Sequence, residues 1–394
     1  MIKIGFIGNY SKEWMGGVNY LSNLLYAISC LEDRKIEPIV FLGHKTDIEI
    51  IQKFQPHARI IRDSLFDRQS LKYFISKISE KVFKTSFFTT VLLKKYGIQV
   101  LSHSEITNGY ENFIKINWIP DFQHLHLPEL FSSKERIQRD SIYLKTLLTS
   151  DKVIVSSHDA YKDAKQFAPQ YINKVKVLQF VSQPNQQVFN LDKAYIKSLE
   201  SKYGFKGKFF YLPNQFWKHK NHALVFEATK LLKDQGIDIL ILCSGHMHDY
   251  RNPKYIQTLQ DYIKQNELQD NIKLLGLIDY TDVLYFMRFS IAVINPSLFE
   301  GWSSTVEECK SIGKNMVLSN IPIHKEQKPP DSLYFDPSDA QELSSSLKKL
   351  YLDNTPIPNK ELETHAKHEL RRRTLDFANT YQNIILASIE AAKR

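Results

Sequence analysis

The stretch IAVINPSLFEGWSSTVEECKSIG, residues 291–313, contains one complete strand–loop–helix unit. The short apolar run 291–297 predicts a buried strand, and the polar loop that follows it holds Glu300. The segment 304–312 is expected to be a helix, because small polar residues that can cap its start precede it. Parallel strands buried on both faces appear as continuous apolar runs joined by helices, so this unit favours an α/β fold.

The same alternation of apolar runs and helical stretches recurs along the whole chain. Further strands are predicted at 2–8, 37–43, 98–104, 116–120, 152–157, 174–180, 208–214, 238–245, 271–276, 314–320 and 332–336. Helices are predicted between them, among others at 17–32, 136–149, 220–235, 253–267, 281–288 and 339–352. Two successive series of such units predict two doubly wound α/β domains, joined by the polar linker 181–192.

Length and composition agree with a globular protein of two domains. The chain has 394 residues, 43% of them hydrophobic and 24% charged. Its three cysteines (Cys30, Cys243 and Cys309) are widely spaced, which fits buried thiols in a reducing cytoplasm better than disulfides or a zinc site. Neither a signal peptide nor an apolar stretch of about 18 residues is present, so a cytoplasmic location is expected. The net charge of +9 favours a polyanionic partner, such as nucleic acid, a phosphorylated ligand or an anionic membrane face.

The loop and helix start after the strand at 291–297 can bind an anion. Free backbone N–H groups and the partial positive charge of a helix N-terminus suit a phosphate. Ser303, Ser304 or Thr305 can cap the helix, and Glu307 can close a capping box. Glu300 before the helix and Glu308 on it can accept hydrogen bonds from sugar hydroxyls. The alternative is a capped helix with acidic residues in its first turn and no ligand.

Two other turns carry residues suited to a phosphorylated ligand. In YLPNQFWKHKNH (211–222), Lys218 and Lys220 follow a strand and could neutralise a leaving diphosphate, unless this is an ordinary solvated basic turn. Gly16 and Gly17 lie where the first helix begins and would let the backbone approach a ligand. A tight turn explains the glycine pair equally well, and the loop does not match GxGxxG.

Two segments remain ambiguous from the residues alone. WIPDFQHLHLPELF (118–131) is rich in polar side chains, but no spacing completes a metal-ligand set, so contact with a substrate hydroxyl or packing is expected. The stretch 74–97 mixes phenylalanines with lysines. It could lie on an anionic bilayer or pack on the sheet as an ordinary amphipathic helix, and packing is the preferred interpretation.

Taken together, these motifs resemble the family 4 retaining glycosyltransferases with the GT-B fold. The resemblance rests on Glu300-x7-Glu308 with its flanks NPSLFEGW and EECKSIGKNMVLSNIPIHKEQ, on FWKHKNH and on MGG. It implies an N-terminal acceptor-side domain at 1–185, a donor-binding domain at 190–369, a cleft between them and a C-terminal helix, about 370–394, packed back on the first domain.

The resemblance also implies roles for individual residues. Glu308 would bind the ribose of the nucleotide, Glu300 the transferred sugar, and the amides near Ser304 and Thr305 the diphosphate. The catalytic candidates are Glu300, His124, Asp121 and Lys220. The donor-binding candidates are Gly16, Gly17, Lys218, Lys220, Ile278, Gly301, Ser303, Ser304, Thr305 and Glu308.

The donor phosphates require separate consideration. The family usually has an arginine five residues before the lysine of the basic turn, and this chain has Gln215 there. Lys218 could supply the missing charge. No Asp-x-Asp pair is present, so no metal is expected, and the helix start with Lys218 and Lys220 would stabilise the leaving group.

The expected activity is transfer of a sugar from a UDP- or GDP-linked donor to an acceptor hydroxyl with retained configuration. The likeness implies a bacterial surface polysaccharide or lipopolysaccharide pathway, a glycan or lipid-linked glycan acceptor, and a cytoplasmic enzyme that can contact the inner membrane face. Two alternatives stay open. One is an NAD-dependent oxidoreductase, although the first turn lacks GxGxxG, and the other is a non-catalytic binder of polyanions or nucleic acid, although no reader motif is present.

Overall fold

The computed structural model describes the chain except residues 9, 12–14, 84–85, 105–109, 111, 191–192, 354–356 and 394. Parts of three predicted segments lie outside the described residues: the glycine loop before residue 15, positions 84 and 85 of the lysine- and phenylalanine-rich stretch, and the end of the predicted linker. The described chain divides into two compact units. Unit 1 comprises 1–122, 132–181 and 372–394, and unit 2 comprises 123–131 and 182–371.

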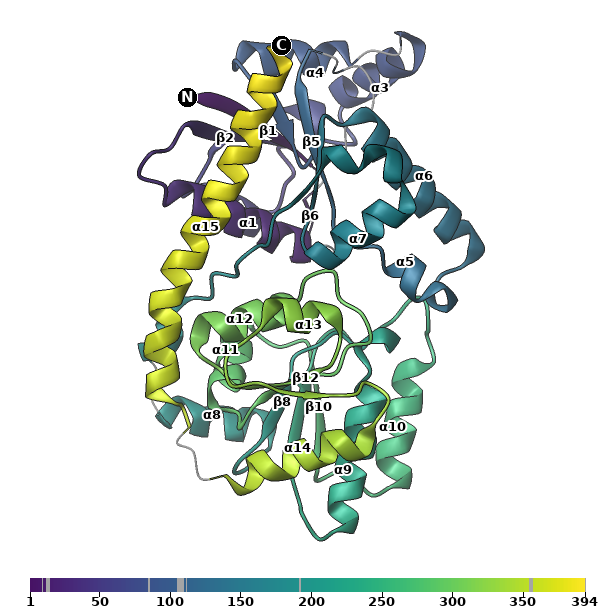
Figure 1. The fold of residues 1–394 in the computed structure, drawn as a ribbon, viewed down its shortest axis with the longest axis vertical. Coiled ribbons are helices and arrows are strands. Elements are labelled where there is room, and N and C mark those ends of the chain that lie inside the picture. Colours follow the sequence, from purple (N-terminus) through teal and green to yellow (C-terminus); the bar gives the residue numbers. More distant parts are fainter. Residues whose placement is uncertain are drawn as a thin grey trace. The chain divides into compact units, whose positions relative to one another are not determined.

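Unit 1 is built on a seven-stranded parallel sheet in the order β3-β2-β1-β4-β5-β6-β7 (Figure 1). Its strands are β1 Ile2–Ile7, β2 Ile36–Leu42, β3 Arg59–Arg62, β4 Val100–Ser102, β5 Ile114–Ile119, β6 Lys152–Val155 and β7 Val175–Val177. Its helices are α1 Met15–Ser29, α2 Ile48–Phe54, α3 Leu71–Phe83, α4 Phe87–Lys95, α6 Ser133–Thr149 and α7 His158–Phe167. The order runs outward from β1 in one direction and from β4 in the other, which is the doubly wound arrangement.

Unit 2 repeats this arrangement with six parallel strands in the order β10-β9-β8-β11-β12-β13. The strands are β8 Phe210–Leu212, β9 Ile241–Ser244, β10 Ile272–Gly276, β11 Val293–Asn295, β12 Met316–Ser319 and β13 Leu333–Phe335. The helices are α5 Gln123–His126, α8 Lys193–Tyr203, α9 His222–Asp234, α10 Tyr255–Gln265, α11 Tyr280–Phe289, α12 Ser304–Ile312, α13 Pro322–Gln327 and α14 Ala340–Leu352. The predicted pair of doubly wound α/β folds is therefore confirmed.

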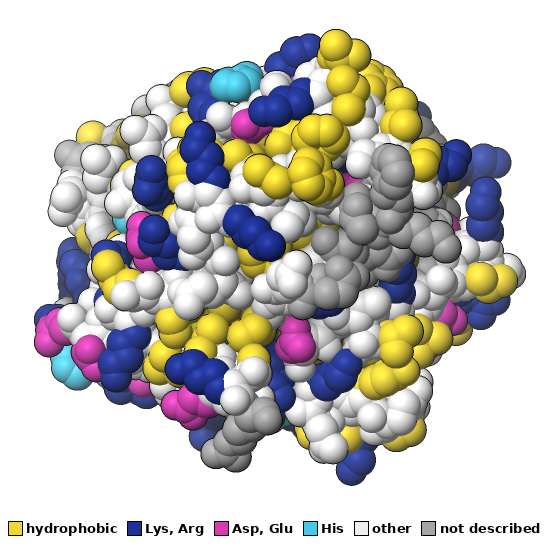
Figure 2. All heavy atoms as spheres, turned by 90° about the horizontal axis from the view of Figure 1, so that it is seen from above, with side chains coloured by type: hydrophobic (Ala, Val, Ile, Leu, Met, Phe, Trp, Pro, Cys, Tyr) yellow, Lys and Arg dark blue, Asp and Glu magenta, His cyan; other side chains and the backbone are white. Residues whose placement is uncertain are grey.

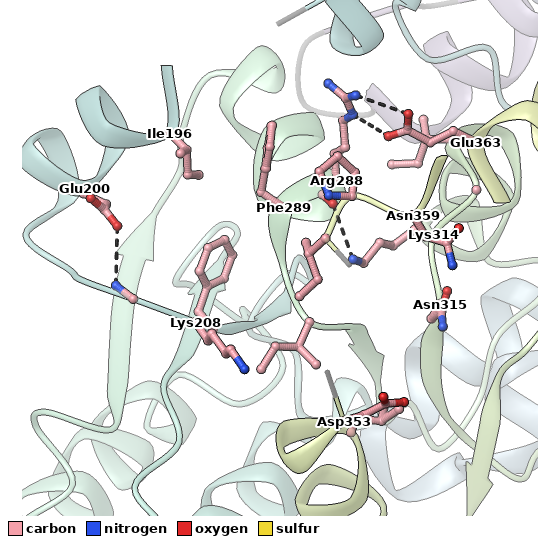
Figure 3. Close-up of a pocket in the computed structure, with 18 of the residues that line it drawn as sticks. Ile196, Glu200, Lys208, Arg288, Phe289, Lys314, Asn315, Asp353, Asn359 and Glu363 are labelled. Carbon is pink, nitrogen blue, oxygen red and sulfur yellow. Dashed lines mark hydrogen bonds and ion pairs between the residues drawn. The ribbon is translucent and has the colours of Figure 1, made fainter. Parts of the chain in front are cut away.

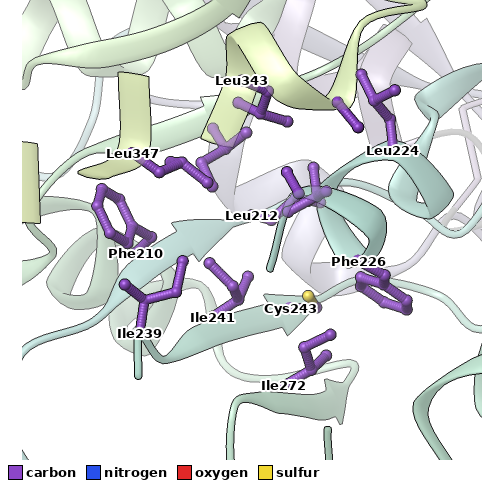
Figure 4. Close-up of a cluster of buried hydrophobic side chains, with 14 of the residues drawn as sticks. Phe210, Leu212, Leu224, Phe226, Ile239, Ile241, Cys243, Ile272, Leu343 and Leu347 are labelled. Atoms are coloured by element: carbon purple, nitrogen blue, oxygen red, sulfur yellow. The ribbon is translucent and has the colours of Figure 1, made fainter. Parts of the chain in front are cut away.

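Strand β8 shows why the apolar runs are continuous. Phe210 and Leu212 pack with helices α9 and α14 on one face of the sheet, as Figure 4 shows for Leu224, Leu343 and Leu347. Tyr211, between them, joins a second cluster on the other face with residues of α11 and α12. Each large apolar side chain buried in this way stabilises the fold by about 1.5–3 kcal/mol. A strand with both faces covered therefore cannot alternate apolar and polar residues.

The C-terminal helix α15 spans Lys360–Ala392, so it begins about ten residues before the predicted start. The part from Arg372 onward belongs to unit 1. There Phe377, Tyr381 and Ile385 are buried, and Tyr381 donates a hydrogen bond to Ser102 at 2.8 Å. The packing of this helix on the first sheet agrees with the fold that the resemblance implied.

The lysine- and phenylalanine-rich stretch does not form one helix packed on the sheet. It contains two helices, α3 and α4, and the preferred interpretation as a sheet-packed helix is wrong for α3. Phe74 and Ile78 are 55% and 63% exposed. Among the described helices none combines the length and apolar character needed to cross a bilayer.

Candidate functional site

The two candidate loops of unit 2 meet at the switch point of its sheet. Strands β8 and β11 are neighbours, and the chain winds away from them in opposite directions. Ligands of open parallel sheets bind outside the carboxyl ends of the strands at such a point. The basic turn follows β8 and the Glu300 loop follows β11, so both predicted segments leave the sheet at this position.

An ion pair connects the two loops. Lys220 Nζ lies 2.6 Å from Glu300 Oε1, and Ser297 Oγ donates to the same oxygen at 2.7 Å. Burial alone would raise the pKa of the Glu300 carboxyl, but the charge and hydrogen bond of Lys220 and the hydrogen bond from Ser297 outweigh it, so that pKa is lowered. Glu300 is therefore an ionised hydrogen-bond acceptor at neutral pH.

Helix α12 begins with two amides available to a ligand. Ser303 is its N-cap and accepts a hydrogen bond from the amide of Val306 at 3.4 Å. Within the described residues, the amides of Ser304 and Thr305 in the first turn have no hydrogen-bond partner. Together with the helix dipole, such amides are suited to an anion.

The predicted capping box is wrong, because Glu307 is one residue too far along the helix. The third helical position is Val306, which has no carboxylate. Glu307 is instead buried and accepts hydrogen bonds from Lys310 at 2.9 Å and Gln327 at 3.1 Å. Gln327 also accepts from the Ser303 amide at 3.1 Å and donates to the Ser303 carbonyl at 2.9 Å. It fixes the helix start, although no sequence motif marks it.

Glu308, the next residue of α12, has different surroundings. Tyr280, the first residue of α11, donates its hydroxyl to Glu308 Oε1 at 2.8 Å. Burial raises the pKa of Glu308 to about 7, against a smaller lowering by the Tyr280 hydrogen bond. The two glutamates of the motif therefore differ, since one is ion-paired and the other has a neutral partner.

The basic turn is more structured than a solvated loop. Lys218 has an exposed side chain, and its amide donates to Asp249 at 3.0 Å. His219 is buried, and burial and the nearby Lys220 and Arg251 charges lower its pKa well below the usual value. Asn221 is at the N-cap position of α9 in a left-handed conformation (φ 56°), but its side chain donates to the Pro337 carbonyl and does not cap.

Arg251 is a further cation beside this turn that the sequence did not single out. Its guanidinium donates to Gln123 at 3.2 Å and lies 4.9 Å from the Trp217 ring and 5.0 Å from the Phe131 ring. It also pairs with Asp249 at 3.5 Å. These contacts attach the segment 123–131 to unit 2.

The predicted histidine segment is thus part of the same compact unit as Glu300. The ring of His126 lies 4.9 Å from the ring of Phe299, the residue before Glu300. His124 is buried, with its ring 6.4 Å from Phe131. Asp121 belongs to unit 1, where it lies 4.0 Å from Arg139.

The remaining candidates occupy less distinctive positions. Gly16 and Gly17 are in the first turn of α1 in unit 1, and a side chain at Gly16 would meet open space. Gly301 is partly buried, directly after Glu300. Ile278 is in the loop between β10 and α11 and packs against the cluster around Leu284.

His324 on α13 is a buried group beside this site that the sequence did not identify. Its Nδ1 bonds to the Ser319 carbonyl at 2.9 Å, and burial lowers its pKa to about 4, so its ring is neutral at pH 7. Ser319 in turn donates to the Ser297 carbonyl at 2.6 Å. These bonds link α13 to the serine that holds Glu300.

A cavity of about 560 Å³ in unit 2 lies at the end of the sheet opposite to the candidate loops (Figure 3). Its lining includes Lys208, Ile291 and Asn315, which precede strands β8, β11 and β12. It is therefore at the amino ends of these strands, away from Lys220 and Glu300. The candidate site is therefore assigned from the position of the motifs at the switch point, and not from the volume of a cavity.

No group of three or more His, Cys, Asp or Glu side chains is arranged to hold a metal ion in the described part of the chain.

Comparison with known proteins agrees with this geometry. Residues 197–369, nearly all of unit 2, match the family glycosyl transferases group 1. The O-antigen chain mannosyltransferase RfbU of Salmonella typhimurium is 23% identical over 145 residues, which span 37% of this chain and 39% of the relative.

Solved structures extend the likeness to the whole fold. HepE of Anabaena in complex with UDP and glucose has a TM-score of 0.70 at 15% identity, over 98% of this chain and 99% of that one. A glycosyltransferase from Rickettsia africae has a TM-score of 0.63 at 15% identity, over 98% and 97%. This chain therefore has the GT-B fold, and its residues 197–369 form a domain of the group 1 glycosyl transferase family.

Proposed function

We propose that this chain is a retaining glycosyltransferase that moves a hexosyl group from a UDP- or GDP-sugar to an acceptor hydroxyl. The observation that carries the proposal is the arrangement at the switch point of unit 2. An ionised Glu300 paired with Lys220, two unbonded amides at Ser304 and Thr305, and Glu308 follow one another there. This order suits a ligand with hydroxyls at both ends and phosphates between them.

The relatives support the donor and the pathway. HepE was solved with UDP and glucose, and RfbU is named as an O-antigen mannosyltransferase. A role in surface polysaccharide or lipopolysaccharide biosynthesis, with a glycan or lipid-linked glycan as acceptor, is the corresponding proposal for this chain.

The chemistry assigns a task to each group. The bond from the anomeric carbon to the diphosphate oxygen breaks, and a bond to the acceptor oxygen forms on the same face of the sugar. The acceptor proton passes to the leaving diphosphate, so no side chain serves as nucleophile. The α12 amides, with Lys218 and Lys220, stabilise the charge that develops on the diphosphate without a metal ion.

Glu300 and the histidine segment would bind the sugar. Glu300 accepts hydrogen bonds from its hydroxyls, and its pairing with Lys220 keeps it ionised. His124 and Asp121 are the further candidates for contact with the sugar or acceptor. The contact between His126 and Phe299 supports the assignment of the histidine segment, because it brings that segment to the residue before Glu300.

We also propose that helix α3 contacts an anionic membrane surface. Five of its apolar side chains are 45–76% exposed: Leu71, Phe74, Ile75, Ile78 and Val82. Lys72, Lys77 and Lys81 lie on the same helix. Figure 2 views the molecule from the side on which α3 and α4 are labelled in Figure 1, and hydrophobic and basic side chains adjoin there. Exposed apolar and basic groups together are typical of a helix at a lipid interface.

Donor turnover tests the main proposal. The protein is incubated with UDP- and GDP-sugars, with and without lipid-linked glycan acceptors and with EDTA, and released UDP or GDP is measured by chromatography. Release from one donor class that is lost in Glu300→Gln and retained in Glu227→Gln, an exposed control on α9, is the expected result. The anomeric configuration of the product, read by NMR, tests retention.

Two outcomes would overturn the proposal. Binding of NAD without turnover of any nucleotide sugar would favour the oxidoreductase. Salt-sensitive binding of nucleic acid with no response to any nucleoside diphosphate would favour the non-catalytic polyanion binder.

A further inference from the structure

The hydroxyl of Tyr280 donates a hydrogen bond to one of the two carboxylate oxygens of Glu308. It donates to Glu308 Oε1 at 2.8 Å across 28 positions of sequence, from the first residue of α11 to the second turn of α12. Glu308 Oε2 accepts no hydrogen bond from any residue in the described part of the chain. One carboxylate oxygen is thus held by the protein and the other is available to a ligand.

Among the described residues, no cation near Glu308 would replace this bond. The titratable groups that face its carboxyl are Tyr280, Tyr211 on β8 and the thiol of Cys309 on α12. No described lysine, arginine or histidine forms an ion pair with it. Glu300 has Lys220 for this purpose, so the two acids of the motif are stabilised by different means.

We propose that Tyr280 is a positioning residue that fixes the Glu308 carboxylate as the acceptor for the ribose hydroxyls of the nucleotide donor. This inference rests on the proposed function, since it assigns Glu308 to the ribose. The hydrogen bond orients the carboxylate, and it favours the charged form, which accepts two hydroxyl protons. Tyr280 is 45% exposed, so its ring lies at the edge of the site.

The pKa values of the two partners support this assignment. Burial raises the pKa of Glu308 to about 7, and the Tyr280 hydrogen bond opposes that rise. Burial around the Tyr280 hydroxyl and the Glu308 charge raise the pKa of Tyr280 well above its usual value, so the phenol remains a donor up to pH 9. Only Glu308 of this pair changes its charge between pH 5.5 and 9.

The test is the pH dependence of UDP binding, and of GDP binding if UDP does not bind, in full-length wild type and Tyr280→Phe. Calorimetry from pH 5.5 to 9 gives the dissociation constant at each pH. Nucleotide phosphates also titrate near pH 6, so the ratio of variant to wild type is taken at each pH. Tyr262→Phe on α10 is the matched control, because it removes a hydroxyl from a partly buried tyrosine outside the site.

For wild type, affinity should rise with pH through about 7 as Glu308 ionises. In Tyr280→Phe the midpoint should move up by about one pH unit, since the variant lacks a hydrogen bond to a charged group. Its affinity should then be roughly tenfold weaker near pH 6.5 and within about twofold of wild type at pH 9. Tyr262→Phe should match wild type throughout.

The outcomes separate this inference from the proposed function. If UDP and GDP bind neither wild type nor Tyr262→Phe, or bind Glu308→Gln as well as wild type, the proposed function fails. If wild type depends on Glu308 but Tyr280→Phe keeps its midpoint, or loses affinity equally at all pH values, Tyr280 does not position the carboxylate. Thermal unfolding of Tyr280→Phe verifies that the variant is folded at each pH of the binding measurements.

Discussion

Lys220 Nζ lies 2.6 Å from Glu300 Oε1, and these two residues follow the two strands at which the sheet of unit 2 reverses its winding. Their side chains are 17% and 10% exposed. The pair therefore joins the turn after β8 to the loop after β11 in a largely buried setting. It also keeps an acid ionised at the point where a ligand of this fold would bind.

Removing one member of this pair should destabilise the protein more than removing both. Lys220→Met leaves the Glu300 charge buried without its cation, and the free energy of unfolding at pH 7 should fall by about 3 kcal/mol. The double variant Lys220→Met, Glu300→Gln should recover part of that loss. Urea unfolding of the single and double variants measures both effects. A loss below about 0.5 kcal/mol in Lys220→Met would show that solvent screens the pair.

Glu308 should lower the stability of the ligand-free protein above pH 7. Its pKa is about 7 in the folded protein and near 4.3 in an unfolded chain. Between these values the folded state binds more protons than the unfolded state, so this group makes stability fall as pH rises from about 4.3 to about 7. Glu308→Gln should therefore be more stable than wild type by roughly 2 kcal/mol at pH 8, and no more stable near pH 4.5.

Urea unfolding at the two pH values measures this difference, and the same variant should lose nucleoside diphosphate binding. Equal stabilisation at both pH values would mean that the carboxyl does not titrate near 7. Glu307→Gln is unsuitable as a control because Glu307 is buried and bonded to Gln327. Glu326, on α13, has an intermediate exposure, and Glu326→Gln serves as the comparison.

The fold was predictable because its strands are covered on both faces. Phe210, Tyr211 and Leu212 are each fully buried, so β8 is a continuous apolar run in the sequence. The edge strand β3, Arg59–Arg62, was missed because its flanking arginines are exposed and only two apolar residues lie between them. Helix α3 was expected to pack on the sheet because its apolar spacing cannot show which side of a helix meets solvent.

The site was predictable only where its residues follow strands. The carboxyl ends of neighbouring strands meet at one edge, which brings Lys220 and Glu300 together from positions 80 residues apart. Tyr280, Gln327 and Arg251 act from helices or loops whose local sequence is ordinary. Their partners are defined by packing, so no spacing rule could have identified them.

Gly313 should be intolerant of any side chain. It ends helix α12 with φ 71°, and a Cβ atom there would collide with the carbonyl of Leu362. Gly236 has a similar φ of 75° with open space around it. Gly236→Ala should therefore cost about 1 kcal/mol for the backbone conformation, and Gly313→Ala about 3 kcal/mol because the clash is added. Thermal or urea unfolding compares the two, and equal costs would mean that the Leu362 backbone shifts without penalty.

An acidic residue at an exposed apolar position of α3 should weaken membrane binding without loss of stability. Phe74 and Ile78 are more than half exposed, so Phe74→Glu and Ile78→Glu remove little buried surface. Each change should lower the fraction bound to phosphatidylglycerol vesicles at low salt about tenfold, as expected for one large apolar side chain that no longer enters the interface. Co-sedimentation measures the bound fraction, and thermal unfolding should be unchanged.

The matched controls are Ile137→Glu and Ile142→Glu on α6, which are also more than half exposed. Wild type that stays in the supernatant, or control variants that lose binding equally, would remove α3 as the membrane contact.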